Sequence, residues 1–166
     1  MQNETINVLF LCTHNSARSI LAEALLNHLG QGKFIGYSAG SSPRDNQQPN
    51  PLGIQALQVA GINTDGLYSK SWGEFALPNA PQMDLVITVC DNAAGEVCPF
   101  WPGQPATAHW SYSDPSAGDG TEAEKLAAFR QTLHAIRRRL ELFVNLPETS
   151  VTKLMLQTSA RALSQS

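Results

Sequence analysis

The chain alternates between short apolar runs and longer segments in which apolar residues recur every three or four positions. Residues 6–12 (INVLFLC) and 84–90 (DLVITVC) are nearly continuous apolar runs, which are typical of strands covered on both faces. Residues 33–40 (KFIGYSAG) predict another strand, and residues 106–110 (ATAHW) predict a short further one. The pattern therefore predicts four strands.

Helical segments are predicted between and after these strands. The first runs from Ser16 to the glycine at position 30, and the second, within residues 50–61, has an Asn-Pro start and a glycine stop. The longest begins at Thr121, whose spacing from Glu124 predicts a capping box. Its apolar positions form one buried stripe: Leu126, Phe129, Leu133, Ile136, Leu140 and Phe143.

This alternation of strands and helices predicts a three-layer α/β fold with a mostly parallel sheet. A short helix opened by Ser71 and Glu74 is expected before the third strand. Ligands collect at the carboxyl ends of the strands in such sheets. Residues 1–146 are expected to form a single catalytic domain, and residues 147–166 a C-terminal tail that is either helical or mobile.

Composition and charge narrow the class of protein. The 166 residues carry a net charge of −3, and the densest basic cluster, residues 137–139, is expected to be a solvated helix face beside Glu141, so neither a nucleic-acid partner nor a membrane surface is expected. The start of the chain lacks the basic region of a signal peptide, and no segment reaches the roughly 20 apolar residues that span a bilayer. A cytoplasmic location is expected. In that compartment Cys12, Cys90 and Cys98 indicate catalytic, redox or plain buried thiols rather than a disulfide framework.

The turn CTHNSARS joins the first strand to the first helix, with Cys12 and Arg18 at its ends. Backbone N–H groups at such a turn point inward and bind anions, and a guanidinium adds a fork of donors that matches an oxyanion. The same positive surroundings lower the pKa of a thiol and make it nucleophilic. No Gly-Lys-Ser/Thr sequence is present, which excludes a Walker A loop. The turn predicts an oxyanion site made by Thr13, His14, Asn15, Ser16, Ala17, Arg18 and Ser19.

The segment VLFLCTHNSARS resembles the phosphate loop of the low-molecular-weight protein tyrosine phosphatases and of the arsenate reductases that share their fold. The resemblance covers residues 5–145, with YSAG and a later Asp-Pro in the expected order. It implies a four-stranded parallel sheet flanked by helices. It also implies that Cys12 is the nucleophile, that Arg18 holds the oxyanion and that Asp114 is the general acid.

The number of thiols separates the two activities of this family. Hydrolysis of a phosphate ester needs one thiol, whereas reduction of arsenate to arsenite needs two electrons, which two thiols supply when they form a disulfide. Cys90 and Cys98 bracket DNAAGEV, which is small and flexible enough to bring them within disulfide distance. The segment VITVCDNAAGEVCPFWPG also resembles the redox segment of arsenate reductases that pass their disulfide to thioredoxin.

The sequence therefore predicts an arsenate reductase with a Cys12, Cys90 and Cys98 relay, which takes arsenate as substrate and thioredoxin or glutaredoxin as reductant. Two alternatives remain open: a phosphatase acting on phosphate monoesters, and an oxyanion-binding or thiol-sensing module without catalysis. Tyrosine-specific relatives carry aromatic residues after the Asp-Pro, where this chain has Ser116 and Ala117, which weakens the phosphatase reading.

Metal sites are not expected. Cys90 and Cys98 lack zinc-ligand spacing. Some relatives bind potassium beside the phosphate loop, and Asn15, Glu23 and Ser38 match that site, but its acidic partner is replaced near Trp72. No metal or other cofactor is therefore predicted.

Overall fold

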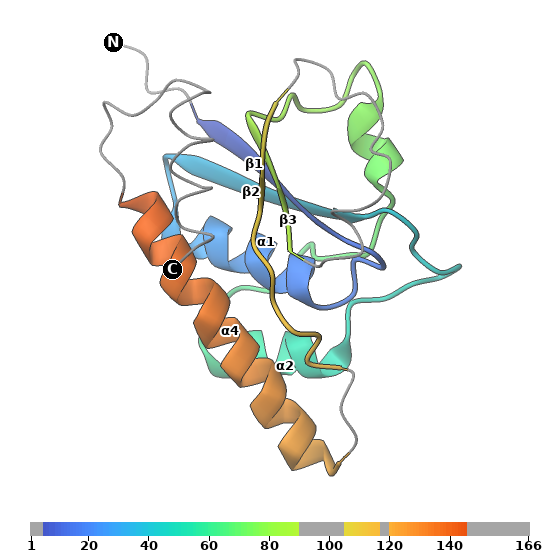
Figure 1. Ribbon diagram of the computed structural model, residues 1–166, viewed down its shortest axis with the longest axis vertical. Helices are drawn as coiled ribbons and strands as arrows, with labels where there is room; N and C mark the ends of the chain where they lie inside the picture. The colour runs from blue at the N-terminus through green and yellow to red at the C-terminus, as the bar shows by residue number, and fades with distance from the viewer. Residues whose placement is uncertain (1–4, 90–104, 117–119, 146–166) are drawn as a thin grey trace.

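The computed structural model describes residues 5–89, 105–116 and 120–145 of the 166. Strands and helices alternate along these residues as the apolar pattern predicts (Figure 1). In chain order the elements are β1 (Ile6–Cys12), α1 (Arg18–Leu29), β2 (Phe34–Gly40), α2 (Pro51–Val59), the 3-10 helix η1 (Trp72–Ala76), β3 (Leu85–Thr88), β4 (Ala106–His109) and α4 (Glu122–Val144).

The four strands form one parallel sheet in the order β2-β1-β3-β4. The central strand β1 has a run of four side chains with no exposed surface, residues 8–11, because neighbouring strands lie on both edges and packed layers lie on both faces. The described part of β3 is shorter than predicted, since pairing ends at Thr88 and position 90 lies outside the described residues. The predicted four-stranded parallel sheet is confirmed.

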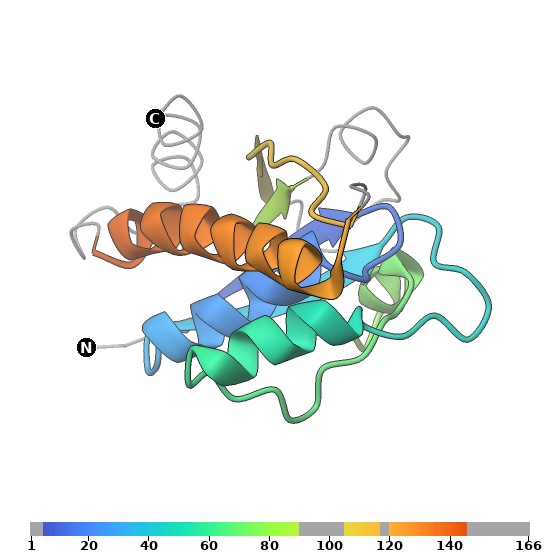
Figure 2. The ribbon, with the colours of Figure 1, turned by 90° about the horizontal axis from the view of Figure 1, so that it is seen from below.

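Helices cover the sheet as the predicted three layers require. Helix α1 packs on β1 and β2, and α4 packs across α1 and α2 (Figure 2). Gly36 on β2 faces α1, since a Cβ there would lie 3.2 Å from the Leu26 Cβ. The next side chain, Tyr37, points to the opposite face, where its ring meets Phe75 of η1 edge-on with centroids 5.6 Å apart. The α/β fold flanked by helices is confirmed.

Polar side chains fix the predicted helix starts. Asn50 caps α2 by accepting a hydrogen bond from the Leu52 N–H at 2.9 Å, with Pro51 in the first turn. Thr121 and Glu124 form the predicted capping box at the start of α4. The predicted stripe of α4 is buried from Phe129 to Phe143, and Leu126 is partly buried.

Helix α1 differs from its prediction in its starting residue. It begins at Arg18 rather than Ser16, because Ala17 stands at the N-cap and residues 13–17 form a loop. Its buried surface is also wider than one stripe and includes Ile20, Ala22 and Leu26. Contacts with the sheet on one side and with α2 and α4 on the others account for this wider burial.

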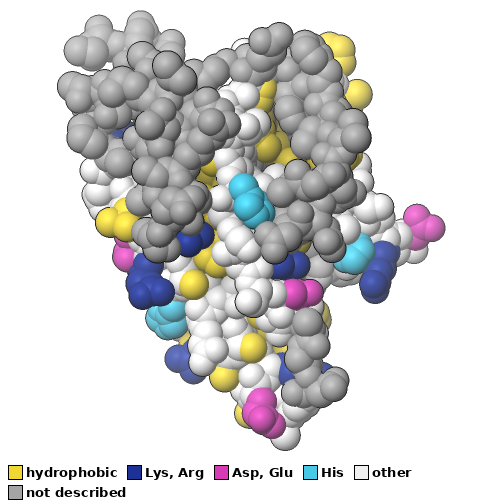
Figure 3. All heavy atoms as spheres, viewed as in Figure 1, with side chains coloured by type: hydrophobic (Ala, Val, Ile, Leu, Met, Phe, Trp, Pro, Cys, Tyr) yellow, Lys and Arg dark blue, Asp and Glu magenta, His cyan; other side chains and the backbone are white. Residues whose placement is uncertain are grey.

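No helix in the described ranges is both long and apolar enough to cross a membrane. On the face that Figure 3 shows, basic and acidic side chains of the described residues are scattered and gather in no large patch of one sign. The predicted tail, residues 147–166, lies outside the described residues.

Candidate active site

The loop that follows β1 is shaped by close backbone contacts at the carboxyl end of the sheet. Cys12 ends β1 with 5% of its surface exposed, and its carbonyl accepts a hydrogen bond from the Ser41 N–H at 3.0 Å. The neighbouring strand ends in Gly40, where a Cβ would lie 2.7 Å from the Thr13 carbonyl oxygen. Only glycine allows β2 to approach the loop so closely. The predicted turn between strand and helix is therefore present.

Asn15 is the buried centre of this loop. Its φ of 55° is left-handed, a conformation that asparagine tolerates better than most residues. Its side chain donates to Ser19 Oγ at 2.8 Å and accepts from the Lys70 N–H at 2.9 Å, while its carbonyl accepts from Ser69 Oγ at 2.6 Å. Asn15 and Ser19 thus brace the loop from within, and neither lines the pocket, although the sequence analysis places both in the oxyanion site.

A pocket of about 580 Å³ opens in front of the loop. Cys12 and Arg18 both line it, and Asp114 reaches it from the segment after β4. The rest of the wall combines other loop residues with the polar segment before α2: Thr13, His14, Ser16, Ala17, Arg44, Asp45, Asn46, Gln47, Gln48, Pro49, Asn50, Pro51 and Ser116. The structure thus brings together residues that lie about a hundred positions apart in the sequence.

The Arg18 guanidinium has partners at its two Nη atoms. Its Nη1 donates to the Tyr112 carbonyl at 2.9 Å, and its Nη2 lies 3.8 Å from Asp114 Oδ2. Its Nε is buried and has no hydrogen-bond partner among the described residues. A buried donor without a partner costs about 1–3 kcal/mol, so this N–H is suited to a ligand that brings an acceptor. A tetrahedral oxyanion fits that requirement.

Asp114 is an anion in this arrangement. Partial burial raises the pKa of its carboxyl, but hydrogen bonds from the Ser116 hydroxyl and N–H, together with the charges of Arg18 and His14, outweigh burial and leave the pKa below its usual value. An oxyanion at Arg18 would supply a competing negative charge and would raise the pKa of Asp114 again. The carboxyl thus gains a proton most readily when the pocket is filled.

Other candidate site residues fall in different places. Thr13, His14, Ser16 and Ala17, which are predicted to bind the oxyanion, line the pocket, whereas Cys90 and Cys98 lie outside the described residues. The sequence interpretation missed the segment from Arg44 to Pro51, although its polar and proline-rich composition indicated a loop. It also missed Tyr112, which acts through its backbone carbonyl and so leaves no signal in the sequence.

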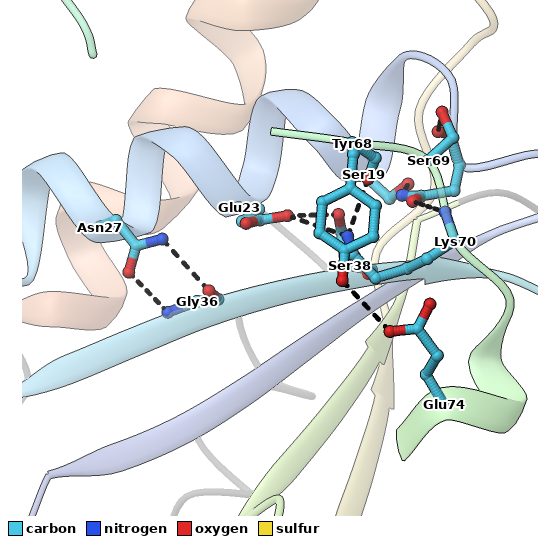
Figure 4. Close-up of polar contacts among 10 residues, drawn as sticks. Ser19, Glu23, Asn27, Gly36, Ser38, Tyr68, Ser69, Lys70 and Glu74 are labelled. Atoms are coloured by element: carbon cyan, nitrogen blue, oxygen red, sulfur yellow. Dashed lines mark hydrogen bonds and ion pairs between the residues drawn. The ribbon is translucent and has the colours of Figure 1, made fainter. Parts of the chain in front are cut away.

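A buried lysine, Lys70, lies among side chains of α1, β2 and the segment that leads into η1 (Figure 4). Lys70 Nζ donates to the Ser38 and Tyr68 carbonyls at 3.0 and 2.8 Å and lies 3.8 Å from Glu23 Oε1. Among the described residues, no group of three or more His, Cys, Asp or Glu side chains is arranged to hold a metal ion. The residues matched to a potassium site, Asn15, Glu23 and Ser38, instead all contact Lys70.

Comparisons with known proteins match this fold and loop. The family model described as low molecular weight phosphotyrosine protein phosphatase matches residues 7–155. An arsenate reductase of Halalkalibacterium halodurans is 36% identical over 142 residues, which are 82% of this chain and 93% of that protein. An arsenate reductase of Bacillus subtilis is 36% identical over 143 residues, which are 86% of this chain and 96% of that protein.

Solved structures agree with these matches. One described as an arsenate reductase in the phosphate binding state superposes with a TM-score of 0.67 and 28% identity over 84% of this chain and 97% of that one. A thioredoxin-dependent arsenate reductase of Corynebacterium glutamicum superposes with a TM-score of 0.55 and 26% identity. That likeness covers 86% of this chain and 65% of the other.

Proposed function

Because this chain belongs to the low molecular weight phosphotyrosine protein phosphatase family, we propose that it is an arsenate reductase that uses Cys12 as its nucleophile. The observation that carries the proposal is the pocket shared by Cys12 and Arg18, in which one guanidinium N–H is buried without a partner among the described residues. The curated relatives at 36% identity support arsenate as the substrate.

In the first step, arsenate binds in front of the loop and its oxygens accept hydrogen bonds from loop amides and from Arg18 Nε. The Cys12 thiolate attacks arsenic and forms an S–As bond while one oxygen departs. Asp114, whose pKa rises when the anion occupies Arg18, gives its proton to that oxygen, which leaves as water. The result is a covalent thiol–arsenate adduct on Cys12.

In the second step, the Cys90 thiolate attacks the Cys12 sulfur and a disulfide forms between them. The S–As bonding pair stays with arsenic, so As(V) becomes As(III) and two thiols lose two electrons in total. Cys98 then attacks Cys90, which releases the Cys12 thiolate and leaves a Cys90–Cys98 disulfide. An external dithiol, thioredoxin or glutaredoxin, reduces that disulfide; the thioredoxin-dependent structural relative favours thioredoxin.

A phosphatase acting on small phosphate esters is the second candidate, because the family model is that of a phosphatase and the pocket holds the same nucleophile, arginine and acid. Hydrolysis requires only Cys12, Arg18 and Asp114, and water takes the place of Cys90. A phosphatase therefore does not need Cys90 or Cys98, whereas the proposed arsenate reductase requires both.

The test follows NADPH consumption through thioredoxin and its reductase, with and without arsenate, in the wild type and in Cys12→Ser, Cys90→Ser and Cys98→Ser variants. Hydrolysis of an aryl phosphate is measured on the same preparations. We expect Cys12→Ser to lose both activities, and the other two variants to lose arsenate turnover while slow aryl phosphate hydrolysis persists. Arsenate turnover that survives in Cys90→Ser would refute the relay, and rapid ester hydrolysis without arsenate reduction would favour the phosphatase.

A further inference from the structure

Lys70 is a buried cation for which the proposed chemistry has no use. Only 5% of its side chain is exposed, and its ammonium group lies 4.2 Å from the centre of the Tyr68 ring in addition to its contacts with two carbonyls and Glu23. Burial raises the pKa of Glu23 and lowers that of Lys70, and the attraction between the two groups opposes both changes. A buried ion pair of this kind adds little to stability when compared with apolar residues of similar volume. Its presence therefore requires another explanation.

The contacts of Lys70 join three separate elements. Glu23 belongs to α1, Ser38 belongs to β2, and Tyr68 and Lys70 belong to the segment that leads into η1. Glu23 also accepts a short hydrogen bond from the Ser38 hydroxyl. Figure 4 shows Glu23 pointing from α1 toward the end of the lysine side chain. One ammonium group thus fixes this segment against the helix and the strand that enclose the phosphate loop.

The same segment holds the phosphate loop through its backbone. The Lys70 N–H donates to Asn15 Oδ1 at 2.9 Å, the Ser69 hydroxyl donates to the Asn15 carbonyl at 2.6 Å, and the Lys70 carbonyl accepts from the Gly40 N–H at 2.8 Å. Asn15 sets the left-handed turn that directs the loop toward the pocket. A shift of residues 68–70 would therefore move Asn15 and the start of α1 together.

We propose that Lys70 is a positioning residue for the oxyanion site: its ammonium acts as a built-in cation that holds residues 68–70 in the register that fixes the Asn15 turn. The inference rests on the proposed function for its meaning, since a misplaced loop would bind arsenate weakly and activate Cys12 poorly. Its test does not require turnover, because phosphate binding and the reactivity of Cys12 report loop geometry directly.

A cavity beside Lys70 makes the proposal testable by chemical rescue. It measures about 450 Å³, and its wall includes Glu23, Ser38, Tyr68 and Lys70. Lys70→Ala would enlarge this space and leave Glu23 and the two carbonyls without their cation. Methylammonium carries the same donors as the lysine head group and is small enough to enter. Tetramethylammonium carries an equal charge but no N–H, so it serves as the control.

The experiment uses Cys90→Ser, Cys98→Ser protein, in which Cys12 is the only thiol. Phosphate affinity is measured by titration calorimetry, and the apparent pKa of Cys12 is obtained from the pH dependence of iodoacetamide alkylation. We expect Lys70→Ala and Lys70→Met to weaken phosphate binding about tenfold, the effect of one charge-assisted hydrogen bond, and to raise the apparent pKa of Cys12. Methylammonium restores both quantities in Lys70→Ala, but not in Lys70→Met, where the methionine side chain fills the space.

Two matched variants complete the test. Lys33→Met removes the lysine at the opposite end of β2 and is expected to change neither quantity. Glu23→Gln keeps Lys70 and removes its counter-charge, so it reports a smaller loss in the same direction even if Lys70→Ala does not fold. If the Lys70 variants unfold at lower temperature but bind phosphate and alkylate like their parent, Lys70 is merely structural and the proposal is wrong. Rescue by tetramethylammonium equal to that by methylammonium would also overturn it.

Discussion

Replacing Asn15 tests how the phosphate loop is held. The side chain has no exposed surface, and without its Oδ1 the buried Lys70 N–H loses its acceptor. That loss costs about 1–3 kcal/mol in either Asn15→Gly or Asn15→Ala. The alanine variant also carries a Cβ in a left-handed conformation, at a further cost of about 1–2 kcal/mol, whereas glycine fits the turn but loses about 0.4–1 kcal/mol through its more flexible unfolded chain.

We therefore expect both variants to be less stable than the wild type, with Asn15→Ala about 1 kcal/mol below Asn15→Gly. Urea denaturation at pH 7 measures the difference, and a phosphate titration on the same samples shows whether the loop still binds. Asn46 is a matched control because its φ of 59° is also left-handed but its side chain is exposed. Asn46→Gly should lose no more than about 1 kcal/mol, the cost of the more flexible unfolded chain alone. An Asn15→Gly variant as stable as the wild type would refute the reasoning.

Three further changes test other parts of the structure. Gly40→Ala places a Cβ 2.7 Å from the Thr13 carbonyl oxygen and should abolish measurable phosphate binding, whereas Gly73→Ala, whose nearest contact is 3.7 Å away, should bind normally. Asp114→Asn should lower stability at pH 7 by less than about 1 kcal/mol, because the carboxyl is partly exposed. Since the pKa of Asp114 is depressed in the folded protein, this difference is present above pH 3.8 and disappears as the pH falls through the folded value; a difference that grows in acid would contradict the assignment. Thr121→Ala removes the capping box and should cost about 1 kcal/mol in urea denaturation without changing phosphate affinity.

Local patterns in the sequence were sufficient for most of the fold. The strands that form the centre of the sheet are continuous apolar runs, and Asn50 and Thr121 cap helices by contacts within three residues of themselves. Helix α1 begins two residues later than its sequence pattern predicts, because the loop before it is held by distant segments. The sequence of the loop itself gives no indication that Gly40 on β2 and residues 69–70 hold it in place.

The same distinction between local patterns and distant contacts applies to the candidate site. The pairing of Cys12 with Arg18 follows from their spacing around one turn, whereas the role of Asp114 follows only from the family resemblance. Sequence patterns do not disclose the Tyr112 carbonyl that holds Arg18, because every residue has a carbonyl. The buried role of Lys70 is hidden for a related reason: a single lysine in a polar segment is ordinarily exposed.

The separation between Arg18 and the carbonyl that holds it has a consequence for the newborn chain. The two residues are 94 positions apart, so at about 5–20 residues per second a ribosome makes the cysteine loop some 5–19 s before Tyr112 is available. During that interval Cys12 and Arg18 are both present, but the carbonyl that fixes the guanidinium has not yet been made. The loop therefore acquires its anion-binding geometry only after the segment beyond β4 has been made.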